Sequence, residues 1–251
     1  MEEQKVSIQA QMPRAQEQKL GIGDGIVGML NVFVDPKGAA RRIPAPLSWI
    51  WPVITLIIIY VVAGYLMLPY TMSLIDLRIN QQITQNNTPL EQAERGRAFM
   101  HAIYQYLPLA APVIVLLMLL LVAWLVAVMG SIAGLRAKFR DIFSLMAACT
   151  LIQALQAIAI YIVVHAKGDE ITSAEQLTPP FGLDIFLPNI HGALFALVNY
   201  FSIFQVWYLI VLTIGLAALA KSSNGKAFFA ITPVWFLGLL YRVVAAMLQP
   251  S

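Results

Sequence analysis

Five long apolar runs dominate the chain, and short polar stretches separate them. They are Leu47–Leu68, Leu107–Met129, Ile142–Val164, Leu194–Ala220 and Ala227–Leu248. Each is close to or above the length of about 20 residues that a helix needs to cross a bilayer. The pattern predicts an all-α polytopic membrane protein, in which residues 46–248 form a bundle of five transmembrane helices.

A shorter amphipathic pattern precedes the first run, over residues 21–45. At helical spacing, Ile22, Ile26 and Leu30 share one face of GIGDGIVGMLNVFV, together with Met29 and Phe33. This pattern is typical of a helix that lies in the membrane interface. A short helix packed under the bundle would show the same periodicity. Residues 1–20 are polar and rich in Gln, which predicts a disordered segment.

The stretch DPKGAARRIPAPLSWIWP joins this segment to the first run. Asp35 followed by Pro36 predicts the start of a second short helix. The cations after it suit anionic lipid headgroups, and the tryptophans suit headgroup depth. We therefore expect a membrane-interface site formed by Lys37, Arg41, Arg42, Trp49 and Trp51. An anchor with no partner role fits the same residues.

The distribution of Lys and Arg between the apolar runs predicts the topology. The amino-terminal segment and the loops after the second and fourth runs carry eleven cations, against four in the other two loops. Since short cytoplasmic loops are enriched in Lys and Arg, the amino terminus is expected in the cytoplasm and the carboxyl terminus outside. The compact chain suggests a bacterial cytoplasmic (inner) membrane.

The loops on the outer side are predicted to be long, over Pro69–Tyr106 and His165–Ala193. Within the first, Thr88, Pro89 and Glu91 form a helix-start signal, so a helix is expected to run from there into the second apolar run.

Composition removes several classes of function. Hydrophobic residues make up 59% of the chain and charged ones 12%, whereas soluble domains carry about 25% charged residues. The net charge is only +3 and the cations are scattered, so no nucleic-acid partner is expected. Cys149 is the single cysteine, which excludes an intrachain disulfide framework.

No catalytic signature is present in the sequence. The three histidines, His101, His165 and His191, lie at or beyond the outer ends of the runs, without metal-ligand spacing. The sequence therefore predicts a protein that is not an enzyme, with no cofactor and no metal site. A membrane metalloenzyme that uses these histidines is the weakest alternative.

Polar residues form a stripe in each of the third and fourth runs. The first stripe contains Gln153 and Gln156, and the second contains Asn199, Ser202 and Gln205. Because the two runs are antiparallel, the stripes are expected at similar depths, facing each other or a common interior. Two roles remain open for this intramembrane polar stripe: hydrogen bonding between helices, or a pathway for a small solute.

Three segments resemble one family. FVDPKGAARRIPAPLSWIWPVI, with Asp35-Pro36, Arg41-Arg42 and Trp49, resembles the opening of bacterial Yip-domain proteins. FSIFQVWYLIVLTIGLAALAKSSNGKAFFAI resembles the family's aromatic-rich span and the turn that follows it. The resemblance implies five spans and a cytosolic amino terminus. Eukaryotic members interact with Rab GTPases through longer cytosolic regions, so a Rab-type partner is not expected here.

These features together predict a non-enzymatic integral membrane protein. We expect it to organise membrane as a trafficking-type scaffold, or to act as an accessory subunit beside other integral membrane proteins. The alternative is a transporter, or a component of a small-solute pathway, that uses the Gln and Asn stripes.

Overall fold

The computed structural model describes residues 20–86, 89–168, 174–187 and 190–248. These residues form helices joined by short connections, with one isolated backbone bridge. The α-helices are α2 (Ile22–Asn31), α3 (Pro36–Arg42), α4 (Ile50–Asn86), α5 (Leu90–Ile132), α6 (Phe139–Lys167), α7 (Gly192–Tyr200), α8 (Ile203–Leu219) and α9 (Asn224–Met247). Two 3₁₀ helices, Ala174–Leu177 and Leu183–Phe186, lie between α6 and α7.

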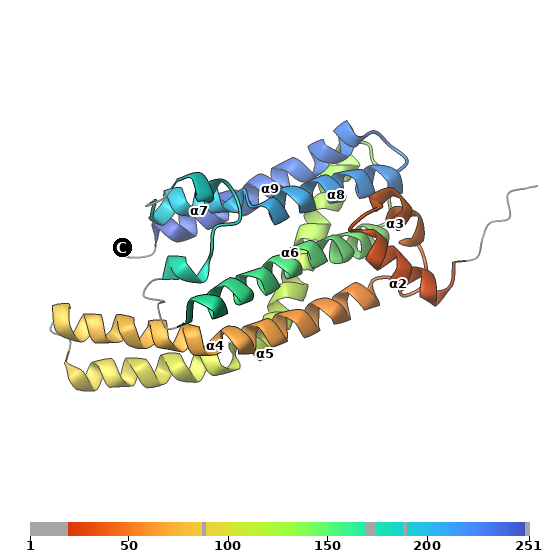
Figure 1. Ribbon diagram of the computed structural model, residues 1–251. Coiled ribbons are helices and arrows are strands. Elements are labelled where there is room, and N and C mark those ends of the chain that lie inside the picture. The colour runs from red at the N-terminus through yellow and green to blue at the C-terminus, as the bar shows by residue number, and fades with distance from the viewer. Residues whose placement is uncertain (1–19, 87–88, 169–173, 188–189, 249–251) are drawn as a thin grey trace, which may run out of the picture.

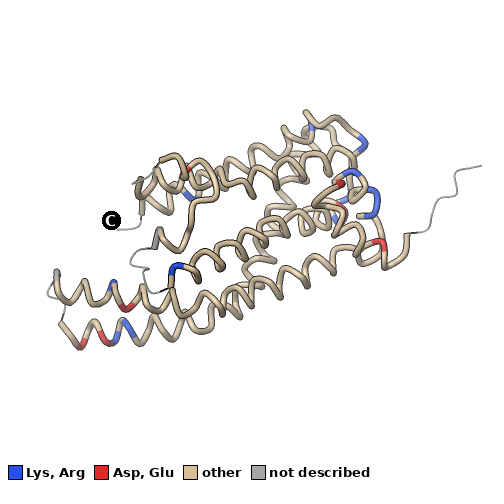
Figure 2. The backbone as a smooth tube through the Cα atoms, in the orientation of Figure 1, with Lys and Arg blue, Asp and Glu red and all other residues tan. Residues whose placement is uncertain are grey.

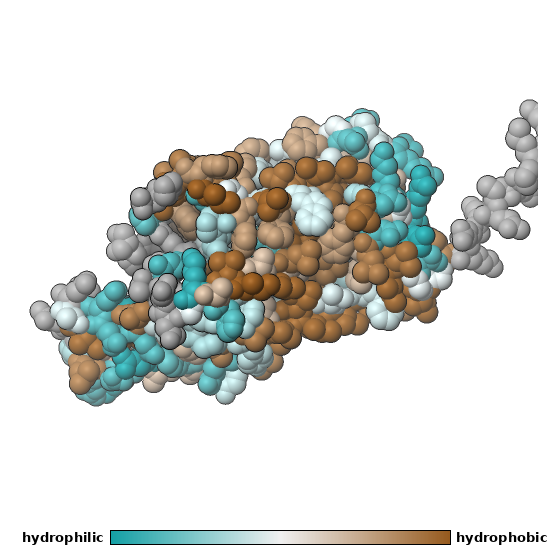
Figure 3. All heavy atoms as spheres, in the orientation of Figure 1, coloured by the Kyte–Doolittle hydropathy of each residue, from teal (hydrophilic) through white to brown (hydrophobic). Residues whose placement is uncertain are grey.

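Four helices are long and apolar enough to cross a membrane: α4, α5, α6 and α9. The shorter apolar helix α8 has 17 residues. Hydrophobic surface covers the middle of the molecule, between polar regions at the α2–α3 end and at the tip of the α4–α5 pair (Figure 3). The described chain thus has the polarity profile of a membrane-embedded bundle.

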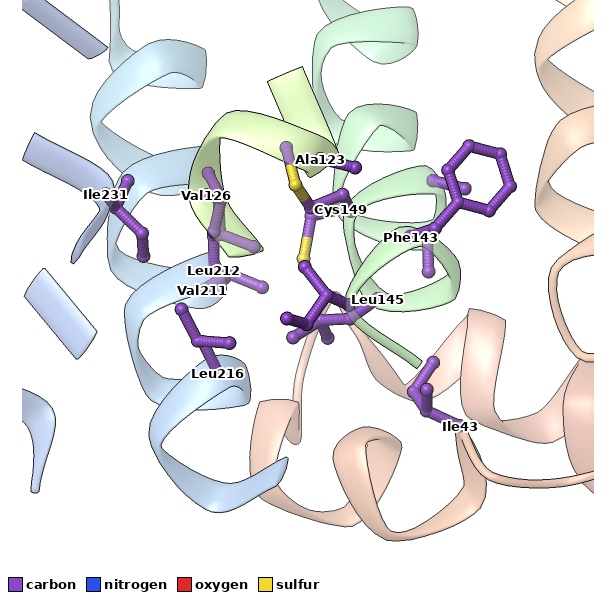
Figure 4. Close-up of a cluster of buried hydrophobic side chains, with 14 of the residues drawn as sticks. Ile43, Ala123, Val126, Phe143, Leu145, Cys149, Val211, Leu212, Leu216 and Ile231 are labelled. Atoms are coloured by element: carbon purple, nitrogen blue, oxygen red, sulfur yellow. The ribbon is translucent and has the colours of Figure 1, made fainter. Parts of the chain in front are cut away.

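Helix α6 occupies the centre of this bundle. Its residues from Asp141 to Ile152 are buried without interruption, because α4, α5 and α8 pack around them. Side chains of α5, α6 and α8 meet there with Ile43 and Ile231 (Figure 4). Cys149 lies in this core and is fully buried. A helix that is apolar on every side is the kind that a large core encloses.

The expected outer loop Pro69–Tyr106 is mostly helical. The sequence predicted the helix that leads into the second apolar run, but not the continuation of α4 beyond Pro69. Helix α4 continues through Pro69 to Asn86, and α5 starts at Leu90 and passes through Pro108 and Pro112. At about 1.5 Å per residue, α4 and α5 extend about 55 and 65 Å, roughly twice the hydrocarbon thickness of a bilayer. The two helices therefore project together beyond the remaining helices (Figure 1).

A small apolar seam holds this projecting pair together. Ile75 and Ile79 of α4 are buried against Ala93 of α5. Beside the seam, the Arg97 guanidinium lies 3.3 Å from the Asp76 carboxylate and donates to Asn80 at 2.7 Å. The apolar positions are too sparse in the sequence to have been recognised, but in an antiparallel pair they meet one another.

Two short helices, α2 and α3, form the amino-terminal part of the described chain. The Asp35 carboxylate accepts a hydrogen bond from the Gly38 amide at 2.9 Å, with Pro36 at the first position of α3. Helix α3 packs on α8, and α2 packs on α3 and α4. An ion pair of 3.4 Å between Arg42 and Asp24 links α2 to α3. Both helices therefore belong to the folded bundle.

The prediction of one continuous helix over Leu194–Ala220 is wrong. Helix α7 ends at Tyr200, and α8 begins at Ile203 after the N-cap residue Ser202. Neither Pro nor Gly stands at this break, so local sequence does not signal it. The physical reason is tertiary: the loop after α6 supplies backbone hydrogen bonds at the break.

Close contact between α6 and α8 leads to a first prediction. A Cβ atom added at Gly215 would lie 2.8 Å from Cδ1 of Leu145, whose side chain is completely buried. Gly215→Val is therefore expected to lower the free energy of unfolding by about 1–3 kcal/mol through overpacking. Thermal unfolding of the purified protein in detergent checks this.

Gly96→Val serves as the control for that substitution. Gly96 is also helical, but nothing lies within 4 Å of its added Cβ. The melting temperature should fall clearly more for Gly215→Val than for Gly96→Val. Equal losses would show that the α6–α8 contact is not tight.

Candidate functional site: a cavity inside the helix bundle

The break between α7 and α8 is closed by the preceding loop. The Ile203 amide donates to the Phe181 carbonyl at 2.9 Å, and Gly182 forms a backbone bridge with Ser202. Backbone polar groups inside a membrane protein must find partners within the protein. The loop meets this requirement, so the helix is interrupted without leaving these groups unpaired.

A buried carboxylate holds the same loop in place. Asp184 is only 6% exposed, and its oxygens accept hydrogen bonds from the Gly182 amide at 2.9 Å and from Asn199 Nδ2 at 2.7 Å. Asn199 of the predicted stripe thus ties α7 to the loop. Within the described residues, no hydrogen bond joins Asn199 to another residue of the two stripes.

The other four stripe residues meet between α6 and α8. Gln153 Nε2 donates to Gln205 Oε1 at 2.9 Å, and Ser202 Oγ donates to Gln156 Oε1 at 3.5 Å. The Ser202 hydroxyl also caps α8 by accepting from the Gln205 amide at 3.2 Å. One hydroxyl therefore serves both the helix start and the contact between the stripes.

A cavity of about 320 Å³ lies beside the Gln153–Gln205 pair. Residues from six helices line it, from α4 through α9. Its polar wall contains this amide pair, Thr150, Trp235 and the phenols of Tyr60, Tyr200 and Tyr208, while most of the other lining side chains are aliphatic. The volume lies at the lower end of the range of about 300–1,000 Å³ for ligand pockets.

The chemistry of the cavity favours neutral, mainly apolar contents. None of the described residues that line it carries a charge. Transport sites for ions and polar solutes usually contain an ionisable side chain. In addition, Gln153 Nε2 and Gln205 Oε1 hydrogen-bond to each other, which leaves fewer polar groups for a solute. This arrangement favours contact between helices and does not favour the transporter alternative.

Residues of the expected membrane-interface site gather at the α2–α3 end. Lys37 and Arg41 are exposed, and Arg42 is partly buried by its pair with Asp24. Trp49 packs against Phe143 with ring centroids 6.3 Å apart, so it belongs partly to the core.

Histidines in the described residues take part in separate contacts. His101 Nε2 lies 3.0 Å from Asp76 Oδ1, and His165 Nδ1 lies 2.7 Å from the Tyr70 hydroxyl. Within residues 20–86, 89–168, 174–187 and 190–248, no three His, Cys, Asp or Glu side chains form a group that suits a metal ion. The described residues therefore give no support to the metalloenzyme alternative.

Arg242 takes a position that the sequence did not indicate. Its guanidinium lies over the ring of Tyr200, 5.4 Å from the ring centroid. This is the geometry of a cation–π contact. The contact joins α9 to α7.

Comparison with known proteins gives one family. A family model described as the Yip1 domain matches residues 30–245, which covers α3 to α9 and most of the described chain. No curated protein and no solved structure matches the chain.

The amide pair yields a prediction by a double-mutant cycle. Gln153→Leu and Gln205→Leu should each destabilise the protein, but together they should cost less than the sum, because both remove the same hydrogen bond. The coupling is expected at about 0.6 kcal/mol and below about 2 kcal/mol. Unfolding in detergent measures it, with the exposed Gln105→Leu as control. Strict additivity would contradict the contact.

Docking of the loop yields a further prediction. A Cβ atom at Gly182 would lie 2.3 Å from the carbonyl oxygen of Phe201, so backbone must move to accept it. Gly182→Ala should therefore raise hydrogen exchange several-fold at Ile203 and over residues 181–187. Gly225→Ala is the control, because its added Cβ meets open space and its backbone is not in the left-handed region. Unchanged exchange in Gly182→Ala would show that the loop does not seal the break.

Proposed function

Because this chain belongs to the Yip1 domain family, we propose that it is a non-enzymatic membrane scaffold or accessory subunit that assembles with other integral membrane proteins. The observation that carries this proposal is the positively charged surface at the α2–α3 end, where both short helices pack on the bundle. The family match and the apolar helices place the chain in a lipid bilayer as a multi-pass helical bundle. The scaffold role is our inference from that setting.

Cations gather at one end of the bundle, as Figure 2 shows near α2, α3 and the α8–α9 turn. Among the described residues there, eight Lys and Arg face three Asp. Asp24 pairs with Arg42, Asp141 lies 3.2 Å from Arg140, and Asp35 caps α3. The acids are thus engaged locally, and the excess positive charge is available to an anionic surface.

Helix α2 places apolar side chains beside these cations. Its buried face consists of Gly25 and Gly28, while Ile22, Ile26 and Leu30 remain exposed. An exposed apolar face next to Lys and Arg suits the headgroup region of a bilayer. This supports an interfacial position for α2, with Lys37 and Arg41 at the headgroups.

The proposed topology follows from the same charge distribution. Since Lys and Arg favour the cytoplasmic side, the α2–α3 end is assigned to the cytoplasm. Helices α7 and α8 together would then form a fifth crossing, although neither is long enough alone. The carboxyl terminus would lie outside, and we assign the chain to a bacterial inner membrane. A Rab-type GTPase is not among the expected partners.

Charge reversal at exposed cations tests the scaffold role. Lys37→Glu with Arg41→Glu removes surface charge but leaves the Arg42–Asp24 ion pair intact. We expect a correctly inserted protein whose crosslinks to neighbouring membrane proteins fall several-fold. The measurements are protease accessibility of both termini and crosslinking in native membranes, followed by mass spectrometry.

The control reverses two cations at the opposite end. Arg78 and Arg95 are exposed on the projecting α4–α5 pair, so Arg78→Glu with Arg95→Glu changes the same amount of charge there. If both double variants keep the same crosslinked partners as the wild type, the α2–α3 surface is not the docking site. If the first variant fails to insert, the double variant Lys37→Gln with Arg41→Gln, which removes the charges without reversing them, repeats the test.

A further inference from the structure

The cavity inside the bundle changes polarity along its length. Toward the α7 end, its wall contains Gln153, Gln205 and Trp235. Toward the α3 end, it is closed by Val126, Met146 and Leu212, each 1% exposed. One end can therefore hold a hydrogen-bonding group, and the other end suits hydrocarbon alone.

The mouth of the cavity faces the apolar surface of the molecule. Ile114 and Met118 of α5 line the cavity and are 48% and 57% exposed. They belong to the part of α5 whose hydropathy identifies it as a membrane span. In the membrane, the space in front of this mouth is filled by lipid chains, and water is scarce there.

One hydrogen-bond donor at the polar end is free. Gln205 uses its carbonyl oxygen to accept from Gln153, and its own NH₂ group makes no hydrogen bond within the described residues. Trp235 Nε1 also has no partner in the part of the chain that the structure describes, but it is buried, so a ligand in the cavity does not touch it. The polar end therefore offers a single amide donor, and most of the wall offers contacts for hydrocarbon.

We propose that the cavity binds one acyl chain of a bilayer phospholipid, which enters between the helices past Ile114 and Met118. The chain extends toward Met146 and Leu212, while its ester and headgroup stay outside the cavity. No cation lines the cavity, so neither a phosphate nor a carboxylate is expected inside it. The site does not depend on any protein partner.

Photocrosslinking tests this with the full chain in vesicles. The probe is phosphatidylcholine with a diazirine in its acyl chain, and mass spectrometry maps the labelled residues. We expect labelling of Met146 and Leu212, which bulk lipid cannot reach because both are buried. Their labelling should saturate with probe and fall on addition of unlabelled phosphatidylcholine, in contrast to the exposed Leu121.

A pair of adjacent substitutions supplies the matched control. Val122 lines the cavity, whereas Leu121 is exposed and does not. Val122→Phe should reduce labelling of Met146 and Leu212 at least five-fold, and Leu121→Phe should leave it unchanged. Val122→Ala, which keeps the space open, should retain labelling if Val122→Phe proves unstable by gel filtration. Labelling confined to exposed residues, or insensitive to Val122→Phe, would overturn the proposal.

Discussion

Enclosure of α6 on every side is the constraint on which the remaining structure depends. From Asp141 to Ile152 this helix presents no face to the outside, so its neighbours must approach closely all round. Ala147, Ala148 and Cys149 are small enough to permit this, and Gly215 of α8 fits against Leu145. Lipid is as apolar as these side chains, so shape complementarity, rather than exclusion of water, stabilises such contacts.

Close packing at one end of α6 leaves room at the other end. Beyond Ile152 the stripe residues begin, and α8 starts only at Ile203, after the break. The cavity lies where the tight core gives way to the amide pair and the aromatic residues around α7. The interrupted helix and the cavity therefore have a common origin: the loop that seals the break also determines where α8 begins.

The two ends of the bundle differ in charge and in shape, so the proposed scaffold would present a different surface at each end. At one end, α2 and α3 pack on the core and present Lys37 and Arg41. At the other end, α4 and α5 continue as a paired projection held by Ile75, Ile79 and the Arg97–Asp76 contact. In the membrane position proposed above, such a protein would offer one surface near lipid headgroups and a separate one well beyond them.

The sequence by itself determined the apolar helices, the Asp35–Pro36 helix start and the uneven distribution of cations, because each depends on residues close together in the chain. It also indicated the two polar stripes that contain Gln153 and Gln205, because the spacing within each stripe follows helical geometry. Tertiary structure alone decided the break at Ser202, the pairing of α4 beyond Pro69 with α5, and the cavity. Each of these depends on backbone or side chains brought together from distant segments, and no local pattern records such contacts.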